Sequence, residues 1–344
     1  MGVGDHTAID DFLTGKTKTL RHELIALTAR IATIDRHAAR DTDHDVGTTI
    51  SNEREGERGE AWDICAAGFK RTEQALRSLE EYGKLVDADF ARQIEALRYR
   101  VYSLEKAFDV GRSSRDRLEG IRLCVLVDGR DSAAEFERLV RELVAANVGM
   151  IQLRDKRLDD RELLSRGRQL RELTRGTPTL CIINDRADIA AAVQADGVQL
   201  GQDDLTVKDA RAIIGTRMLI GVSTHTIEQA RAAVLEGANY LGAGPMFPSQ
   251  TKSFETFAGL DFLREVAAEI RLPTFAIGGI TPQNLPEVLA TGCARVAVSA
   301  AVTGTGDAIS AVRQFSNILK VKTSSSTDVL NPEGIASFSP GLRR

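Results

Sequence analysis

Eight short hydrophobic runs alternate with amphipathic stretches of helical period along the chain after residue 112. Aliphatic runs that alternate with helical patterns are typical of βα units, in which the strands are parallel. Because the connections between parallel neighbours are right-handed, eight consecutive units can close on themselves. We therefore predict an α/β protein with a (β/α)8 TIM barrel, with a doubly wound open sheet as the alternative. The predicted strands are IRLCVLV at 121, GMIQL at 149, TLCII at 179, DGVQL at 196, MLIGVS at 218, YLGAG at 240, PTFAIGG at 273 and ARVAVSA at 294.

The chain before the barrel has heptad spacing, which predicts long helices. One apolar seam begins at Leu20 and another at Phe90, and a third helical stripe runs from Trp62 to Leu79. We predict an α-helical N-terminal domain over residues 1–116, with an accessory role or a role in forming a homo-oligomer. The barrel is assigned to residues 117–320. Residues 321–344 are serine-rich and have no periodicity, so we predict a disordered tail.

Composition and charge restrict the class of function. The chain has 344 residues, enough for about two domains, and a net charge of -4. Such a charge supplies no positive field for nucleic acid or an anionic membrane, and no apolar run is long enough to span a bilayer. The four cysteines include no CxxC pair, which argues against a zinc site or a disulfide framework. We expect a cytoplasmic enzyme that acts on small molecules, without nucleic-acid or membrane partners.

Polar side chains follow the predicted second strand, at the barrel end where active sites are built. Gln152, Arg154 and Lys156 alternate along this strand end, so they project toward the same side. Any one of them could form a salt bridge or hydrogen bond with a neighbouring element. An amide and two cations in phase favour an anion-binding site instead.

Carboxylates follow the next two predicted strands. Asn184 and Asp185 end the third strand, and Asp203 and Asp204 follow the fourth. A lone aspartate at such a position is most often a helix N-cap. Carboxylates on adjacent strands beside cations suit a hard divalent metal, whose coordination is completed by water and substrate phosphates. The sequence therefore predicts a metal site at this edge of the barrel.

The remaining strand ends offer hydroxyls, a histidine and glycines. Ser223 and His225 follow the fifth strand, and a lone histidine in a loop is more often structural than a base. The sixth strand is followed by GPMFPSQTKSFETFAGL, and we expect residues 245–258 to form a lid because long loops at this face often do. Glycines after the seventh strand, together with Ser299 after the eighth, predict a phosphate pocket.

Seven of these segments together resemble the thiamine phosphate synthase family. They are QLRDK, IINDR, GVQLGQDD, IGVSTH, GPMFPSQTK, IGGI and VAVSAAV, and the resemblance covers essentially all of residues 121–319. The stretch KRTEQALRSLEEYGKLVD also resembles the helical extension that some bacterial members carry before the barrel. Two positions depart from the family pattern, since Gln199 stands where many members have histidine and Ser249 where many have threonine. Neither departure removes a charge from the site, so we expect both to adjust how the site works rather than to abolish its activity.

The resemblance implies a transferase of thiamine biosynthesis, which joins hydroxymethylpyrimidine diphosphate to a thiazole phosphate and releases diphosphate. It implies a dissociative path, in which the thiazole nitrogen attacks a pyrimidine carbocation. Mg²⁺ held near Asp185 and Asp204 would neutralise the leaving diphosphate together with Arg154, Lys156 and Lys252. Such chemistry needs no strong base, which agrees with a site of cations, amides and hydroxyls.

The resemblance also assigns roles to single residues. Lys252 and Ser223 would be the catalytic pair, and Ser223 would lie near the pyrimidine. The other substrate contacts would come from Gln152 and Asn184 at the pyrimidine and diphosphate end, from Ser249 and Thr251 in the loop, and from Gly279, Val298 and Ser299 in the thiazole phosphate pocket.

Three alternatives remain open on the sequence alone. A thiazole tautomerase is a related barrel that would lean on a histidine such as His225, but it has no use for a metal-bound diphosphate. A phosphate-sugar isomerase or lyase would share the glycine-lined pocket without requiring QLRDK beside NDR. A non-enzymatic binding module would turn over no phosphorylated substrate.

Overall fold

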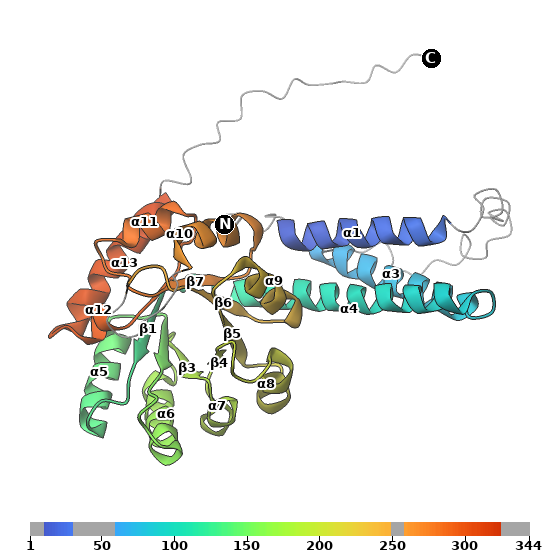
Figure 1. Cartoon of the computed structure of the whole chain (residues 1–344). Helices are drawn as coiled ribbons and strands as arrows, with labels where there is room; N and C mark the ends of the chain where they lie inside the picture. Colours follow the sequence, from blue (N-terminus) through green and yellow to red (C-terminus); the bar gives the residue numbers. More distant parts are fainter. Residues whose placement is uncertain (1–9, 30–58, 249–257, 325–344) are drawn as a thin grey trace, which may run out of the picture.

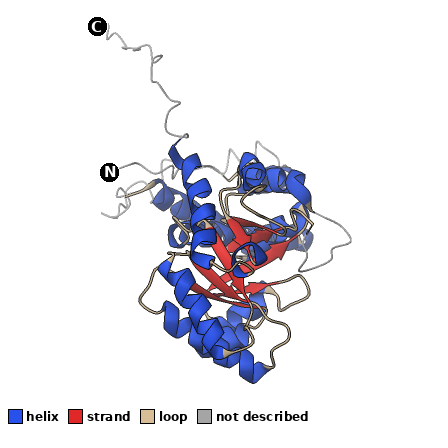
Figure 2. Cartoon of the chain, turned by 90° about the vertical axis from the view of Figure 1, so that its left-hand side faces the viewer, coloured by secondary structure: helices blue, strands red, loops and turns tan. Residues whose placement is uncertain are grey.

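A closed barrel of eight parallel strands forms the centre of the molecule, with neighbours paired in sequence order from β1 to β8 (Figure 2). The computed structural model describes residues 10–29, 59–248 and 258–324. The barrel confirms the predicted fold and excludes the open sheet, and each strand overlaps one of the eight predicted runs. The strands are β1 (Leu123–Val127), β2 (Met150–Leu153), β3 (Leu180–Asn184), β4 (Gly197–Leu200), β5 (Leu219–Thr224), β6 (Tyr240–Ala243), β7 (Thr274–Ile277) and β8 (Val296–Val298).

Helices connect the strands, and capping side chains fix where several of them begin. Ser132, Asp159, Thr206 and Thr226 each accept a hydrogen bond from a backbone N–H in the first turn of the helix that follows. Each cap satisfies a donor that the helix itself leaves unpaired. The helices are α5 (Ala133–Ala145), α6 (Asp160–Thr174), α7 (Ala187–Val193), α8 (Val207–Ile214), α9 (Ile227–Glu236), α10 (Gly259–Glu269), α11 (Leu285–Ala290), α12 (Ala300–Thr303) and α13 (Ala308–Ser324).

The strands divide their side chains between two hydrophobic clusters. One set packs against the surrounding helices in the large outer core. The other set fills the barrel itself, and it includes Cys124, Met150, Ile182, Tyr240 and Phe275 from five different strands. Complete burial of such side chains contributes about 1.5–3 kcal/mol each, so the barrel interior is a packed core over part of its length.

In the part of the chain before the barrel that the structure describes, three helices form an arm that projects from the barrel (Figure 1). They are α1 (Asp11–Thr28), α3 (Ala61–Gly83) and α4 (Ala88–Arg117), with α1 and α3 both packed on α4. The two later helices coincide with the seams predicted from Trp62 and Phe90. A buried ion pair, 2.7 Å from Arg98 Nε to Glu80 Oε2, links α4 to α3.

The far end of α4 closes the amino-terminal end of the barrel. Leu118, just after α4, is fully buried and packs with the side chains inside the barrel. Asn239 Nδ2 donates to Ser114 Oγ at 3.0 Å, and Lys106 Nζ donates to the carbonyl of Glu236 at 2.7 Å. The arm is therefore anchored at the barrel end opposite to the carboxyl ends of the strands.

Two further observations concern the end of the chain and the character of its helices. The last described helix, α13, continues to Ser324, and residues 325–344 of the predicted tail lie outside the described residues. Within the ranges that the structure describes, no helix is long and apolar enough to cross a membrane.

Candidate active site

A pocket opens inside the barrel, and all eight strands contribute to its wall. Four of the residues predicted from sequence line it together: Gln152, Arg154, Asn184 and Ser223. They come from the ends of β2, β3 and β5, which the closed barrel brings around one axis. The rest of the wall is formed by Cys124, Leu126, Met150, Gln199, Tyr240, Gly242, Phe275, Ile277 and Ala297.

Ser223 is held on both its side chain and its backbone. Gln199 is buried in the pocket wall, and its Nε2 donates to Ser223 Oγ at 3.1 Å. Gln202 Nε2 donates to the carbonyl of Ser223 at 2.6 Å. The departure from the family pattern at Gln199 therefore lies in the pocket itself, where the amide orients the serine hydroxyl.

A glycine makes room for this arrangement. A Cβ atom at Gly221 would lie 2.3 Å from Gln199 Oε1 and 2.2 Å from the ring of Tyr240. Any larger residue would push both side chains out of the wall, so the position requires glycine.

The two carboxylates predicted to hold a metal face each other at the rim. Burial and the neighbouring Asp204 carboxylate raise the pKa of Asp185 above its ordinary value. Lys156 Nζ lies 3.5 Å from Asp185 Oδ2 and opposes this shift. Asp185 has a φ of 62°, a left-handed conformation, and its N–H donates to the carbonyl of Gln199 at 2.7 Å.

This donor set fits Mg²⁺. Mg²⁺ prefers oxygen ligands, and proteins often bind it through one or two carboxylates while waters and substrate phosphates complete the octahedron. A divalent cation would also offset the repulsion between the two carboxylates that contributes to the raised pKa of Asp185. Among the described residues there is no cluster of three or more His, Cys, Asp or Glu side chains that could hold a metal, so substrate oxygens would have to supply the remaining ligands.

The residues predicted to bind a phosphate, Gly279, Val298 and Ser299, lie at the ends of β7 and β8, and none of them is in the wall of the pocket inside the barrel. Gly279 has a φ of 64°, and a Cβ there would lie 2.5 Å from the carbonyl oxygen of Pro248. Only glycine lets the backbone after β7 approach the loop after β6 this closely. Val298 ends β8, and Ser299 Oγ donates to the carbonyl of Leu126 on β1 at 3.1 Å.

The beginning of the loop after β6 is anchored on both sides. The ring of His225 contacts the carbonyl of Gly244 through Nδ1, which must carry the proton because a carbonyl only accepts. The N–H of Met246 donates to the carbonyl of Ile277 at 2.9 Å. His225 thus has a structural role here. The three predicted contacts in the loop, Ser249, Thr251 and Lys252, lie outside the described residues, and the lid stays a prediction.

Comparison with known proteins decides the family. The model of a family described as thiamine monophosphate synthase matches residues 123–302, more than half of the chain. The chain belongs to the thiamine monophosphate synthase family. It is 42% identical over 299 residues to a thiamine-phosphate synthase of Rhodopirellula baltica, covering 84% of this chain and 80% of that protein. A thiamine-phosphate synthase of Gloeobacter violaceus is 41% identical over 290 residues, covering 84% and 83%.

The thiamine monophosphate synthase relationship extends to solved structures and to the arm. A thiamine phosphate pyrophosphorylase from Pyrococcus furiosus is 37% identical with a TM-score of 0.53, covering 58% of this chain and 96% of that one. A second model, described as the ThiD2 family, matches residues 6–107, which include most of the arm. Membership makes this chain a transferase of thiamine biosynthesis, and the non-enzymatic alternative is wrong.

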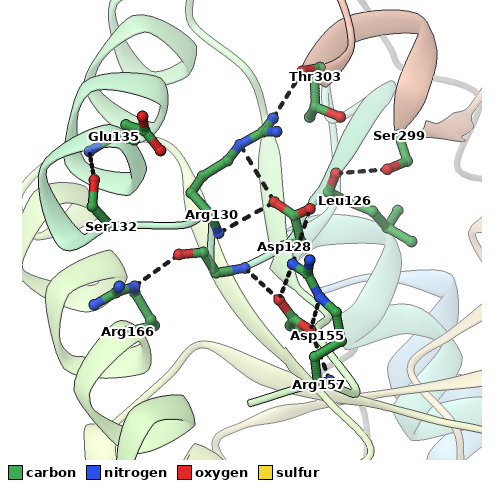
Figure 3. Close-up of polar contacts among 11 residues, drawn as sticks. Leu126, Asp128, Arg130, Ser132, Glu135, Asp155, Arg157, Arg166, Ser299 and Thr303 are labelled. Atoms are coloured by element: carbon green, nitrogen blue, oxygen red, sulfur yellow. Dashed lines mark hydrogen bonds and ion pairs between the residues drawn. The ribbon is translucent and has the colours of Figure 1, made fainter.

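The sequence reasoning missed the residues that support this synthase site from behind. Asp155 lies between Arg154 and Lys156, and its side chain is only 2% exposed. It accepts hydrogen bonds from Gly129 N–H at 3.0 Å and Arg157 Nη2 at 2.8 Å (Figure 3). The Arg157 guanidinium lowers the pKa of Asp155 to about 2. The signal was the neighbouring position, because in an extended chain the residue after one that faces the pocket faces the other way.

Proposed function

We propose that this chain condenses hydroxymethylpyrimidine diphosphate with hydroxyethylthiazole phosphate to give thiamine phosphate and diphosphate, with Mg²⁺ as cofactor. The observation that carries the proposal is the common pocket of Gln152, Arg154, Asn184 and Ser223, drawn from three strand ends. These side chains combine amides, a cation and a hydroxyl, the groups that suit a heterocycle joined to a diphosphate.

The diphosphate would lie at the rim, beside β2, β3 and β4. Mg²⁺ bound by Asp185 and Asp204 would supply positive charge to the departing oxygens. Arg154 lines the pocket, and Lys156 lies at the same rim beside Asp185. Hydrogen bonds from these cations to an anion are stronger than neutral ones, and they are most valuable where charge develops during the reaction.

The proposed path breaks a bond before it makes one. The C–O bond to diphosphate breaks, the electron pair leaves with the diphosphate, and the pyrimidine methylene carbon becomes a carbocation. The lone pair of the thiazole nitrogen then forms the new C–N bond, so neither step needs a base. Gln152 and Ser223 would orient the pyrimidine, and Tyr240 and Phe275 in the wall would keep water from the cation.

The thiazole phosphate would be bound at the ends of β7 and β8 by Gly279, Val298 and Ser299. In the closed barrel these ends lie on the other side of β1 from β2, so the two phosphorylated ends of the substrates occupy different sectors of one mouth. The loop would add Ser249, Thr251 and Lys252, with Lys252 as a catalytic group at the leaving diphosphate.

We also propose the division into residues 1–116, 117–320 and 321–344, a cytoplasmic location, and self-association through the arm. Large apolar side chains at the α3–α4 turn support association, because Tyr82, Leu85 and Val86 are 74%, 83% and 89% exposed. Sedimentation of the full chain tests this point. A purely monomeric species at all concentrations would contradict it.

The experiment for the activity incubates the purified chain with both substrates and Mg²⁺, and measures thiamine phosphate by fluorescence after oxidation. Product should form with Mg²⁺ and disappear when the metal is chelated. Asp204→Asn should lose this Mg²⁺-dependent turnover. Asp209→Asn removes the same charge from the first turn of α8, where the carboxylate pairs with Thr206, and should retain it. Absence of thiamine phosphate from the unmodified chain would refute the proposed function.

A further inference from the structure

The segment between β1 and α5 lies between the two halves of the proposed site. β1 pairs with β2 on one side and with β8 on the other. The end of β2 carries the cations proposed for diphosphate, and the end of β8 carries the residues proposed for the thiazole phosphate. The intervening residues Asp128, Gly129 and Arg130 have no assigned role in either half. They nevertheless form hydrogen bonds to residues that follow β2 and to residues that follow β8.

Toward β2, the segment is fixed by Asp155. Gly129 N–H donates to Asp155 Oδ2 at 3.0 Å, and Arg157 Nη2 contacts both Asp155, at 2.8 Å, and Asp128, at 3.5 Å (Figure 3). A nearly buried carboxylate with several charge-assisted hydrogen bonds holds its partners in one geometry. The segment therefore keeps a fixed position relative to the strand end that bears Arg154.

Toward β8, the segment is fixed by the side chain of Arg130. Its Nη2 donates to the carbonyl of Thr303, the last residue of α12, at 2.8 Å, and its Nε lies 3.3 Å from Asp128 Oδ1. The planar guanidinium can make both contacts at once. Ser299, the N-cap of α12, donates a hydrogen bond from Oγ to the carbonyl of Leu126 on β1. Figure 3 shows these contacts arranged across the loop from Asp155 to Thr303.

Arg130 also adopts a backbone conformation that arginine normally avoids. Its φ is 54°, in the left-handed region that favours glycine. Strained residues of this kind persist where the surrounding structure requires the particular side chain, and they are concentrated at functional sites. The neighbouring carbonyl of Gly129 accepts from Arg166 Nε at 2.8 Å, which helps to hold the strained conformation.

We propose that Arg130 is a positioning residue. Through Thr303 it fixes the β8–α12 turn, residues 299–304, to the loop after β1, and it thereby sets the binding geometry for the thiazole phosphate. This inference rests on the proposed function, which places that phosphate at Val298 and Ser299. Arg130 acts through the turn and through Asp128. It lies on the thiazole side of the site, so its loss should affect one substrate more than the other.

The test compares Arg130→Gly, Arg130→Lys and Gln194→Gly. Glycine at 130 removes the side chain and relieves the left-handed backbone, which offsets part of the stability lost with the side-chain contacts. Gln194 has a similar φ of 56° at the C-cap of α7, away from the pocket, and is the matched control for backbone relief. For each variant, steady-state kinetics give kcat and the KM for both substrates. Native-state hydrogen exchange follows the backbone amides of residues 299–304.

Arg130→Gly should raise the KM for the thiazole phosphate by about tenfold, as loss of a supporting contact behind a site commonly does. The KM for the pyrimidine diphosphate should change less than twofold, and exchange in residues 299–304 should become faster. Arg130→Lys should fall between Arg130→Gly and the unmodified chain, since lysine can reach only one of the two partners at a time. Gln194→Gly should match the unmodified chain in all of these readouts.

Unchanged exchange in residues 299–304 would overturn the proposal, whatever the activity. Faster exchange with an unchanged KM for the thiazole phosphate would also overturn it, because Arg130 would then stabilise the turn without affecting the substrate. If the unmodified chain makes no thiamine phosphate, the proposed function fails separately. The exchange experiment still decides whether Arg130 holds the turn.

Discussion

The surroundings of Asp185 make the ionised form of its carboxyl group unfavourable in the folded state. Its backbone is left-handed, its carboxylate is partly buried, and the Asp204 carboxylate beside it raises its pKa. A folded-state pKa above the unfolded value means that ionisation near neutral pH disfavours the folded state. A cation bound by Asp185 and Asp204, as proposed, would reverse this balance.

Replacing Asp185 by asparagine should therefore separate activity from stability. We expect turnover to fall by at least about a hundredfold, since a proposed Mg²⁺ ligand is lost and with it positive charge at the leaving diphosphate. The free energy of unfolding should stay the same or rise by up to about 1 kcal/mol. Thiamine phosphate formation across a Mg²⁺ series and urea denaturation measure the two effects. Near-native turnover at low Mg²⁺ would show that Asp185 is not a ligand.

In contrast to Asp185, Asp155 has a lowered pKa, because the Arg157 guanidinium lowers it to about 2. The unfolded value is about 3.9, so its contribution is complete above pH ~4 and is lost as the pH falls toward ~2. Asp155→Asn should lower the free energy of unfolding at pH 7 by about 2 kcal/mol. Urea denaturation at pH 7, 4 and 3 should also show a smaller loss of stability on acidification in the variant.

A matched variant makes the Asp155 result specific. Asp261 forms an ion pair with Arg264 in the adjacent turn of its own helix, and its side chain is 95% exposed. Asp261→Asn should change the free energy of unfolding by less than about 0.5 kcal/mol. Equal effects of the two substitutions would mean that the Asp155 network contributes nothing particular to the fold.

At the scale of elements, the positions of the strands could be predicted from the sequence, whereas the contacts between the loops that follow them could not. Aliphatic runs such as MLIGVS and ARVAVSA located all eight strands, because buried parallel strands have continuous hydrophobic runs. The convergence of Gln152, Asn184 and Ser223 followed from strand order alone. The bonds of Asp155 and Arg130 depend on how neighbouring loops approach each other in space, and no local pattern encodes that approach.

The loop after β6 is the element whose predicted function remains to be tested. At the start of the loop, the N–H of Met246 donates to the carbonyl of Ile277 on β7. If Lys252 meets the leaving diphosphate, Lys252→Ala should lower kcat by about a hundredfold. Product chromatography should show more free hydroxymethylpyrimidine, because water would capture more of the cation. An unchanged kcat with no increase in that alcohol would refute the lid.

At the scale of the whole molecule, the arm and the active site occupy opposite ends of the barrel. The seam from Phe90 predicted a helix with one apolar side, but not the surface that covers it. In the structure α4 packs against α1 and α3, contacts α9, and ends beneath the strands. This placement supports an arm that contributes no catalytic group.

Substitution of Asn239 tests the contact between the arm and the barrel, because this side chain bonds to both. Its Oδ1 accepts from Ile220 N–H and from Arg211 Nη2, both at 2.8 Å, and its Nδ2 donates to Ser114 of α4. Asn239→Ala leaves these buried partners unsatisfied, so the free energy of unfolding should fall by about 2–3 kcal/mol. The kcat and both KM values of the folded enzyme should remain within twofold, since the joint lies away from the pocket. A selective loss of kcat would connect the arm to catalysis.

The alternation at the end of β2 has a consequence for how this protein can vary. Directly after Leu153, Arg154 lines the pocket, whereas the next residue, Asp155, accepts from the N–H of Gly129 in the neighbouring loop. Inserting or deleting one residue before Arg154 would turn its side chain away from the pocket and that of Asp155 away from Gly129, because the side-chain period of an extended chain is two. Descendants of this sequence can therefore change identity at these positions one residue at a time. They cannot change length there without losing substrate contacts and structural support in a single event.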